Sequence, residues 1–211
     1  MPAGNRAALH DDRGADDDVL RLLRTGTAAE HEDVERALDL MDPALSRSRL
    51  VHVLDLMHGF WRAAEHGLDE WATRRPDDAA RLDWTRRRRT ALFAEDLHRL
   101  GATPSGSAPE LPAVAGTDEA LGRMYVLEGS TLGGVFIARH LAELPGLAGT
   151  RIRAFSPYGS ETGAMWADFR RVTRAVVAEG GDARAVVESA RTTFAVLAGW
   201  CRRASLPGVP A

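Results

Sequence analysis

Two groups of residues in this 211-residue chain have types and spacings that suit chemistry. The first is His31, which is followed four residues later by Glu35. Four residues are about one helical turn, so the Glu35 carboxylate can accept a hydrogen bond from one ring nitrogen and leave the other available. Such a carboxylate fixes the tautomer of a metal-bound histidine and raises its basicity. The pair suits a metal ligand, and the alternative is a core histidine whose ring nitrogens bond internally.

The second group is a set of glycines, Gly129, Gly133 and Gly134, within the apolar run YVLEGSTLGGVFIARHL. Each interior glycine costs a helix about 1 kcal/mol relative to alanine, so three together need a reason. Gly129 and Gly133 are four apart and share one face of a helix. That bare face admits either a second helix at close range or a flat ligand laid against the backbone. A single histidine opposite such a face suits a haem iron with an open sixth position.

The elements that must position these residues are helices. A helical pattern begins at the acidic cluster 16–18 and carries His31, Val34 and Leu38 on one face before Pro43 closes it. The same periodicity predicts further helices over about 46–74, 78–100, 117–144, 161–179 and 182–204. The Pro/Gly/Ser-rich stretch 101–116 is the one long predicted loop, and 145–160 is expected to be irregular.

Composition favours one all-α domain over residues 17–205, with a disordered tail at 1–16 and a short C-terminal tail at 206–211. A net charge of -3 and a pI near 6.2 argue against nucleic-acid binding. All 27 basic residues are arginines, and the single cysteine, Cys201, fits a reducing compartment. No apolar run is long enough to cross a membrane, and no signal-peptide pattern opens the chain. We therefore expect a cytoplasmic protein.

Two segments resemble haem oxygenases. The segment LRTGTAAEHEDVE resembles their haem-ligand helix, and MYVLEGSTLGG resembles the distal helix of the bacterial branch. That branch includes the enzymes that make biliverdin for bacteriophytochromes. The segments RRRRTALFAEDLHRLG and SPYGSETGAMWADF are also similar to it, so the resemblance spans about 19–200. It implies a single-domain, haem-oxygenase-like helical bundle.

The resemblance implies roles for residues on the ligand side of the haem. His31 matches the axial ligand of the iron, with Glu35 as its partner. Thr27 lies four residues before it in the family's T-x3-H spacing and is expected to belong to the haem site. Arg24 and Tyr125 match positions that contact the haem propionates.

On the distal side, Gly129 and Gly133 match the glycines that let the backbone cover the oxygen site, with Gly134 beside them. The mammalian branch has an aspartate directly after the first of these glycines, where this chain has Ser130. The resemblance thus implies that Gly129, Ser130 and Gly133 form the catalytic face. Proton delivery must then rest on the backbone, Ser130 and ordered water.

The function implied by the resemblance is cleavage of haem to biliverdin with release of iron and carbon monoxide. Haem is then both substrate and cofactor, and O2 and electrons come from outside. The sequence has no GxGxxG or CxxC motif, so the expected partner is a ferredoxin or a flavoprotein reductase, and a bacteriophytochrome is a candidate receiver of biliverdin. The alternatives are a haem carrier or sensor that does not degrade haem, and a plain helical interaction domain.

Three other features are given structural interpretations. The run 86–89 of four arginines is expected to form a solvated helix face, with docking of an acidic electron donor as the lesser alternative. Glu95 and His98 form a single E-x-x-H pair, whereas a di-iron site needs two, so a di-iron oxidase is a weak alternative. Cys201 is expected to be a buried structural thiol.

Overall fold

The computed structural model describes residues 18–147 and 149–204, and in this part of the chain it contains helices and loops but no strand. The α-helices, with two short 3-10 turns, follow in the order α1 (Val19–Gly26), α2 (Ala28–Leu38), α3 (Arg47–Arg74), α4 (Pro76–Arg81), α5 (Trp84–Arg87), α6 (Thr90–Arg99), α7 (Thr117–Glu143), η1 (Pro145–Leu147), η2 (Gly159–Glu161), α8 (Thr162–Ala178) and α9 (Ala183–Ala204). The expected all-α class is confirmed. The predicted tails, 1–16 and 206–211, lie outside the described residues.

The single helix expected to run from the acidic cluster toward Pro43 is two helices that meet at Thr27. Thr27 has φ -117° and ψ 5°, which is outside helical geometry. Its hydroxyl donates to the Leu23 carbonyl at 2.7 Å, and its own carbonyl accepts from the His31 N–H at 2.9 Å. The break ends α1 and starts α2 in a new direction, and α2 stops at Leu38, before Pro43.

The helix expected over 78–100 is three short helices, α4 to α6. Asp83 adopts the left-handed region at φ 48°, which interrupts the helix between α4 and α5. The first N–H groups of α6 then receive a cap from α3, because the Glu65 carboxylate accepts from the N–H of Arg89 at 2.6 Å and of Thr90 at 3.0 Å. Glu65 therefore caps the start of α6, which receives no hydrogen bond from the side chain at its own N-cap position.

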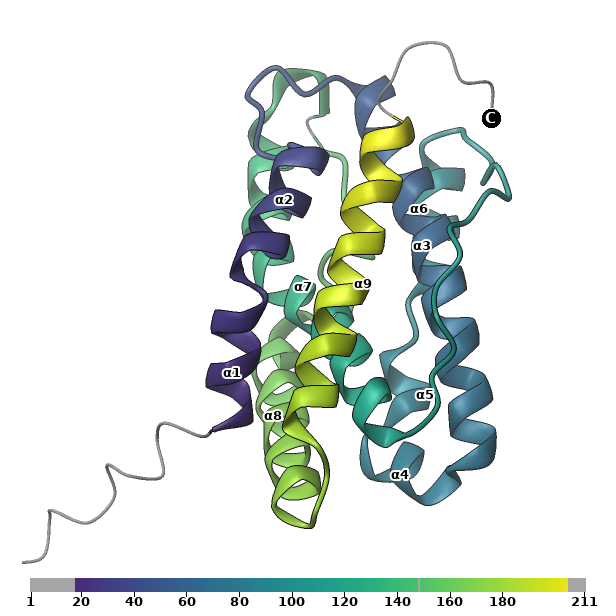
Figure 1. Cartoon of the computed structure of the whole chain (residues 1–211). Coiled ribbons are helices and arrows are strands. Elements are labelled where there is room, and N and C mark those ends of the chain that lie inside the picture. The colour runs from purple at the N-terminus through teal and green to yellow at the C-terminus, as the bar shows by residue number, and fades with distance from the viewer. Residues whose placement is uncertain (1–17, 148, 205–211) are drawn as a thin grey trace, which may run out of the picture.

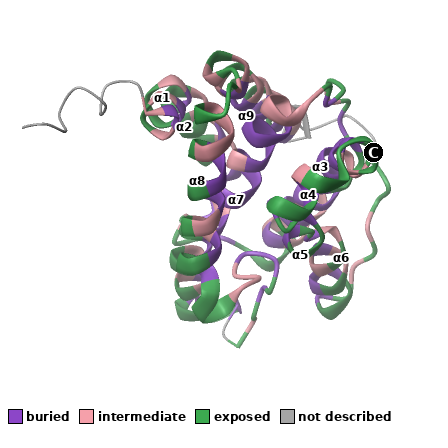
Figure 2. Ribbon diagram, turned by 90° about the horizontal axis from the view of Figure 1, so that it is seen from below, coloured by how far each residue is buried: buried purple, intermediate pink, exposed green. Residues whose placement is uncertain are grey.

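The remaining helices agree with the periodicity to within one or two residues. Figures 1 and 2 both place α1, α2 and α8 on one side of the molecule and α3 to α6 on the other, with α7 and α9 between them. The buried faces turn inward from both sides (Figure 2). Helices α7 and α9 approach closely at Gly122, where an added Cβ would lie 2.2 Å from the Val186 carbonyl oxygen. None of the described helices is both long and apolar enough to cross a membrane.

Candidate functional site

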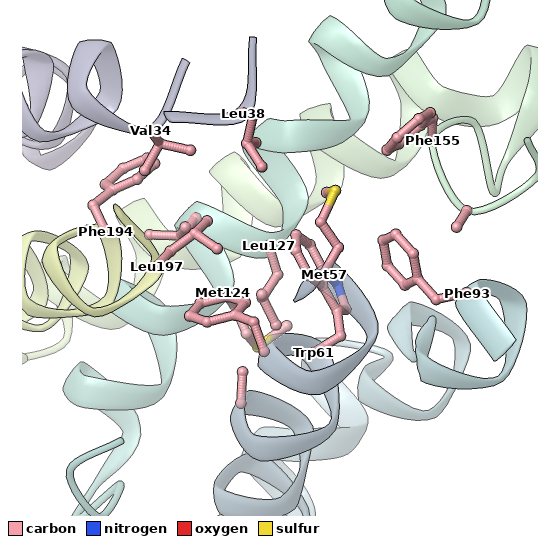
Figure 3. Close-up of a cluster of buried hydrophobic side chains, with 14 of the residues drawn as sticks. Val34, Leu38, Met57, Trp61, Phe93, Met124, Leu127, Phe155, Phe194 and Leu197 are labelled. Atoms are coloured by element: carbon pink, nitrogen blue, oxygen red, sulfur yellow. The ribbon is translucent and has the colours of Figure 1, made fainter. Parts of the chain in front are cut away.

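A cavity of about 690 Å³ lies between the two sides of the bundle, within the range of about 300–1,000 Å³ that is usual for small-molecule sites. Its walls come from α1, α2, α3, α7, α8, α9 and the segment that precedes η2. Much of the lining is apolar and includes Val34, Leu38, Met57, Phe155, Phe194 and Leu197, which Figure 3 shows gathered around the centre of the fold. The predicted site residues that line it are Arg24, His31, Glu35, Tyr125, Gly129, Ser130 and Gly133.

His31 lies at the edge of this cavity and not in the core. Its side chain is 55% exposed, and Nδ1 lies 3.7 Å from Oε2 of Glu35. The Phe194 ring packs edge-on at 5.6 Å between centroids and limits how the imidazole turns. None of the described residues hydrogen-bonds Nε2. The exposure of the imidazole disagrees with the core-histidine alternative, and Glu35 lies beside the ring but, at 3.7 Å, beyond hydrogen-bond distance.

Gly129 and Gly133 present bare backbone to open space. A Cβ built on either residue would meet no atom of the described chain within 4 Å beyond its own helix. A second helix packed on these glycines would place atoms there, so the structure does not support the helix-packing alternative. Both residues line the cavity, so a molecule in the cavity could approach the backbone of α7 at this face.

Gly134, in contrast, faces away from the cavity lining. An added Cβ would lie 1.8 Å from the carbonyl oxygen of Phe155, a contact that no side chain can make. The glycine lets the segment around Phe155 lie directly against α7, and Phe155 itself lines the cavity. Gly134 was expected to contact the bound haem itself. In the structure it does not line the cavity, and it instead allows Phe155 to lie in the cavity wall.

Thr27 is also absent from the lining, because it is buried at the joint between α1 and α2. Its side chain lies close to Tyr125, which is half-buried in the cavity wall. Burial raises the pKa of the Tyr125 hydroxyl, while the nearby Thr27 side chain and the Arg24 cation oppose the rise. Thr27 thus lies beside Tyr125 and starts the helix that carries His31.

One end of the cavity is strongly basic, and most of its residues were not expected. Arg21 and Arg24 come from α1, and Arg170 and Arg174 come from α8. Arg174 is paired with Asp18 at 2.7 Å, whereas the buried Nε of Arg170 has no partner among the described residues. The Arg170 guanidinium lies 5.9 Å from the ring centre of Trp166, which also lines the cavity. The α8 arginines could have been suspected from their i, i+4 spacing, although such pairs are usually solvated.

The expectation that 86–89 forms a solvated face is wrong for two of its four arginines. Arg87 is 1% exposed and Arg89 is 2% exposed. Arg89 lines the cavity, and its guanidinium carbon lies 4.8 Å from the centre of the Trp61 ring. It donates to the Leu127 carbonyl, to Ser130 Oγ at 2.9 Å and to the Ala154 carbonyl at 3.3 Å. Arg89 therefore fixes the distal helix and the hydroxyl beside Gly129.

Arg87 supports the same helix from behind through a buried ion pair. Its Nη1 lies 2.6 Å from Glu128 Oε2, and the Tyr158 hydroxyl donates to the other carboxylate oxygen at 2.8 Å. Burial and the Glu128 charge together raise the pKa of Tyr158, so this hydroxyl keeps its proton at any ordinary pH. Glu128, which directly precedes Gly129, is therefore held in place by Arg87 and Tyr158.

The cavity offers one histidine as a metal ligand, which suits a metal whose other ligands come from a macrocycle. Among the described residues there is no group of three or more His, Cys, Asp or Glu side chains that could hold a metal ion. Glu95 of the E-x-x-H pair is instead bonded to Arg99 and Arg153, which removes support for a di-iron site. One histidine, apolar walls and a basic end together fit an iron porphyrin with carboxylate side chains.

Comparisons with known proteins agree with this reading. A sequence model of the family described as "Heme oxygenase" matches residues 17–203. The NO- and CO-bound haem oxygenase of Neisseria meningitidis superposes with a TM-score of 0.72 at 25% identity, covering 88% of this chain and 91% of that one. The haem oxygenase of Leptospira interrogans gives 0.69 at 15% identity, covering 88% and 99%. No curated protein matches the sequence.

The match to the family spans α1 to α8 and all but the last residue of α9, and the fold agrees with two bacterial members. The cavity brings together the histidine and the bare glycine face that first suggested the resemblance. This chain belongs to the haem oxygenase family.

Proposed function

We propose that this protein is an active haem oxygenase, which opens haem to biliverdin and releases iron and carbon monoxide, using O2 and external electrons. The observation that carries the proposal is the meeting of His31 with the open Gly129–Gly133 face at one cavity. Family membership supports it, because the family generally degrades haem.

The residues present suit haem as the bound substrate. His31 would hold the iron, and Glu35, whose carboxylate lies 3.7 Å from Nδ1, would orient the imidazole after a small rotation brings it within hydrogen-bond distance. Arg24, Tyr125 and Arg170 would hold the propionates at the basic end, since a guanidinium pairs well with a carboxylate. When bound, haem supplies the iron that activates O2 and also the carbon that is oxidised.

The distal side orients a hydroxyl for this chemistry. Ser130 Oγ donates its proton to the Leu127 carbonyl at 2.7 Å and accepts from Arg89 at 2.9 Å. The Ser130 hydroxyl hydrogen is used in the bond to Leu127, and the remaining lone pair of Oγ can accept a hydrogen bond from a water in the cavity. Ser130 would position that water, and the bare backbone at Gly129 and Gly133 would leave room for it beside O2.

Partners and location are also proposed. Electrons would come from a ferredoxin or a flavoprotein reductase, and biliverdin would pass to a receiver such as a bacteriophytochrome. The sequence carries no nucleotide or cluster motif of its own. Cytoplasmic location is in keeping with the one buried cysteine.

The test is an optical titration with haemin, followed by a reductant in air. The wild-type protein should show a sharp Soret band that decays as biliverdin absorption grows. His31→Ala should lose the axial ligand and most turnover but keep its helix content, because the side chain is already 55% exposed. A stable Soret band after reduction in air would indicate a carrier or sensor instead.

The chain offers a matched control for this variant. His66 is 77% exposed and pairs with Glu70 at i+4, 3.4 Å away, on the outside of α3. It repeats the His–Glu spacing without a cavity. His66→Ala should keep the wild-type haem spectrum, and a wild-type spectrum in His31→Ala would contradict the ligand assignment.

A further inference from the structure

An ion pair within the protein occupies one of the arginines at the basic end of the cavity. Asp18, the residue before α1, accepts from Arg174 of α8 with Oδ2, which lies 2.7 Å from Nη2 and 3.1 Å from Nε. Arg174 lines the cavity and has a side chain that is 51% exposed, whereas Asp18 does not line it. A carboxylate of the protein itself is therefore bound to a cation that a ligand in the cavity would otherwise meet.

Asp18 keeps its negative charge and its position. The hydrogen bond from Arg174, supported by the nearby Arg170 cation, holds the pKa of this carboxyl below its usual value against the effect of burial. The Leu20 N–H donates to Oδ1 at 3.1 Å, so Asp18 also caps the start of α1. Helices α1 and α8 pack against each other, and the carboxylate is held by both.

Two neighbouring arginines carry no such partner. Arg24 and Arg170 form no ion pair with any residue that the structure describes. Arg24 acts on the hydroxyl of Tyr125, and Arg170 lies 5.9 Å from the ring centre of Trp166. These two aromatic rings are 5.8 Å apart, so both arginines belong to one part of the cavity wall. Arg174 lies one turn further along α8 than Arg170, about 6 Å away along the helix axis.

A ligand with two carboxylates therefore meets sites of unequal charge. Arg24 and Arg170 offer uncompensated cations, whereas Asp18 neutralises Arg174. In the proposed function, on which this inference rests, the ligand is haem, whose two propionates stand on neighbouring pyrrole rings. We propose that Asp18 is a positioning residue: by neutralising Arg174 it directs the propionates to the other arginines and so sets the rotation of haem in its own plane.

The rotation of haem decides which product forms. The histidine ligand and the bare glycine face of α7 are fixed by the fold, so the carbon bridge that lies beneath this face is the one opened. A propionate that moved from Arg170 to Arg174 would turn the macrocycle and bring a different carbon bridge there. Asp18 would thus determine which biliverdin isomer is made, although it lines no part of the cavity.

The test is Asp18→Asn, which removes the charge and keeps a side-chain oxygen. Asparagine caps a helix as well as aspartate does, so α1 should keep its start. Proton NMR of the cyanide complex of the haemin-loaded protein resolves the haem methyl groups and reports the orientation of haem without turnover. The ratio of the second orientation to the first should rise about 2- to 5-fold, the size of effect that a partly exposed ion pair supports. The biliverdin isomers, separated by chromatography, should change in the same direction.

A second variant and a matched control separate this role from a structural one. The double variant Asp18→Asn, Arg174→Gln removes both charges and should return the orientation ratio to that of the wild type. Glu179→Gln is the control, because Glu179 forms an equally close two-fold pair with Arg81, at 2.6 and 2.7 Å, at the C-terminal end of α8. Neither of these two residues lines the cavity, so the control should change neither the orientation nor the isomers.

Two results would overturn the proposal. They are an orientation ratio unchanged in Asp18→Asn, and a double variant that keeps the shifted ratio. Absence of haemin binding by the wild-type protein would refute the proposed function and this inference with it. Binding of haemin without conversion would refute the proposed function alone, because the NMR ratio needs no turnover.

Discussion

At the scale of single residues, the arginine run shows how position in the fold decides what a charge does. Arg86 and Arg88 are exposed and pair with Glu161 and Asp69 on the surface. Arg87 and Arg89 are buried within the same four residues. A buried guanidinium is tolerated only where acceptors surround it, and here Glu128 and several carbonyls do so. The distal helix is therefore held by polar contacts that its own apolar sequence does not reveal.

The buried Arg87–Glu128 pair gives a prediction about stability. Glu128→Leu should lower the free energy of unfolding by about 3–5 kcal/mol, because it leaves the Arg87 charge buried and poorly compensated. The double variant Arg87→Met, Glu128→Leu should lose clearly less than the sum of the two single variants. Chemical denaturation followed by circular dichroism measures each value.

Glu143→Ala on the same helix is the control for that cycle. Glu143 pairs with Arg139 at 3.4 Å, and both side chains are largely exposed. Its removal should leave stability nearly unchanged, as is usual for surface pairs. Full additivity in the buried double variant would show that the pair is not coupled.

At the scale of elements, α7 combines two uses of glycine in one helix. Gly122 and Gly134 stand where a Cβ would overlap the backbone of α9 or of the segment at Phe155. Gly129 and Gly133 stand where a Cβ would meet open space. The first pair lets other chain segments approach, and the second pair leaves room for a ligand. The apolar pattern and the glycines were visible in the sequence, but this division was not.

This division predicts opposite effects of alanine on the haem-free protein. Gly134→Ala should destabilise it by about 1–3 kcal/mol or more, because the new methyl group overlaps a backbone carbonyl that cannot move alone. Gly129→Ala should be neutral or stabilise it by up to about 1 kcal/mol through helix propensity. Urea midpoints of the two variants measure the contrast. Equal urea midpoints would contradict the conclusion that Gly134 allows a close backbone approach while Gly129 leaves open space.

At the scale of the whole molecule, α9 is the element that joins the two sides. It packs along α7 and α2 and also contacts α1 and α3. Trp200 donates from its indole to the Leu56 carbonyl at 2.9 Å, and Arg191 pairs with Glu30 at 2.9 Å. The cavity depends on this packing, because Phe194 and Leu197 of α9 form part of its wall.

Cys201 reports on the integrity of that packing. The thiol is fully buried, and burial raises its pKa from 9.0 to about 12. Only the thiolate reacts, so at pH 8 the native protein should hold about 1,000-fold less reactive sulfur than the unfolded chain. Labelling with a chromogenic disulfide should be very slow in buffer and fast in urea. Fast labelling of the folded protein would show that α9 opens readily at its end.

The sequence alone determined the positions of the long helices and the choice of candidate site residues. The apolar periodicity placed α3, α7, α8 and α9 to within one or two residues, because each helix turns one face to the core. His31 and the pair Gly129 and Gly133 were singled out by type and spacing, since a helix fixes which residues share a face, and all three line one cavity. The family followed from the same segments.

Tertiary structure alone decided the rest. It broke the first helix at Thr27, capped α6 with Glu65 from α3, buried Arg89 against Ser130, and brought Arg170 to the cavity. The Glu65 cap joins residues 24 and 25 positions apart, and the bond from Arg89 to Ser130 spans 41 positions. Local periodicity carries no information on such partners, because burial and pairing of a charge are set by what the folded chain places beside it.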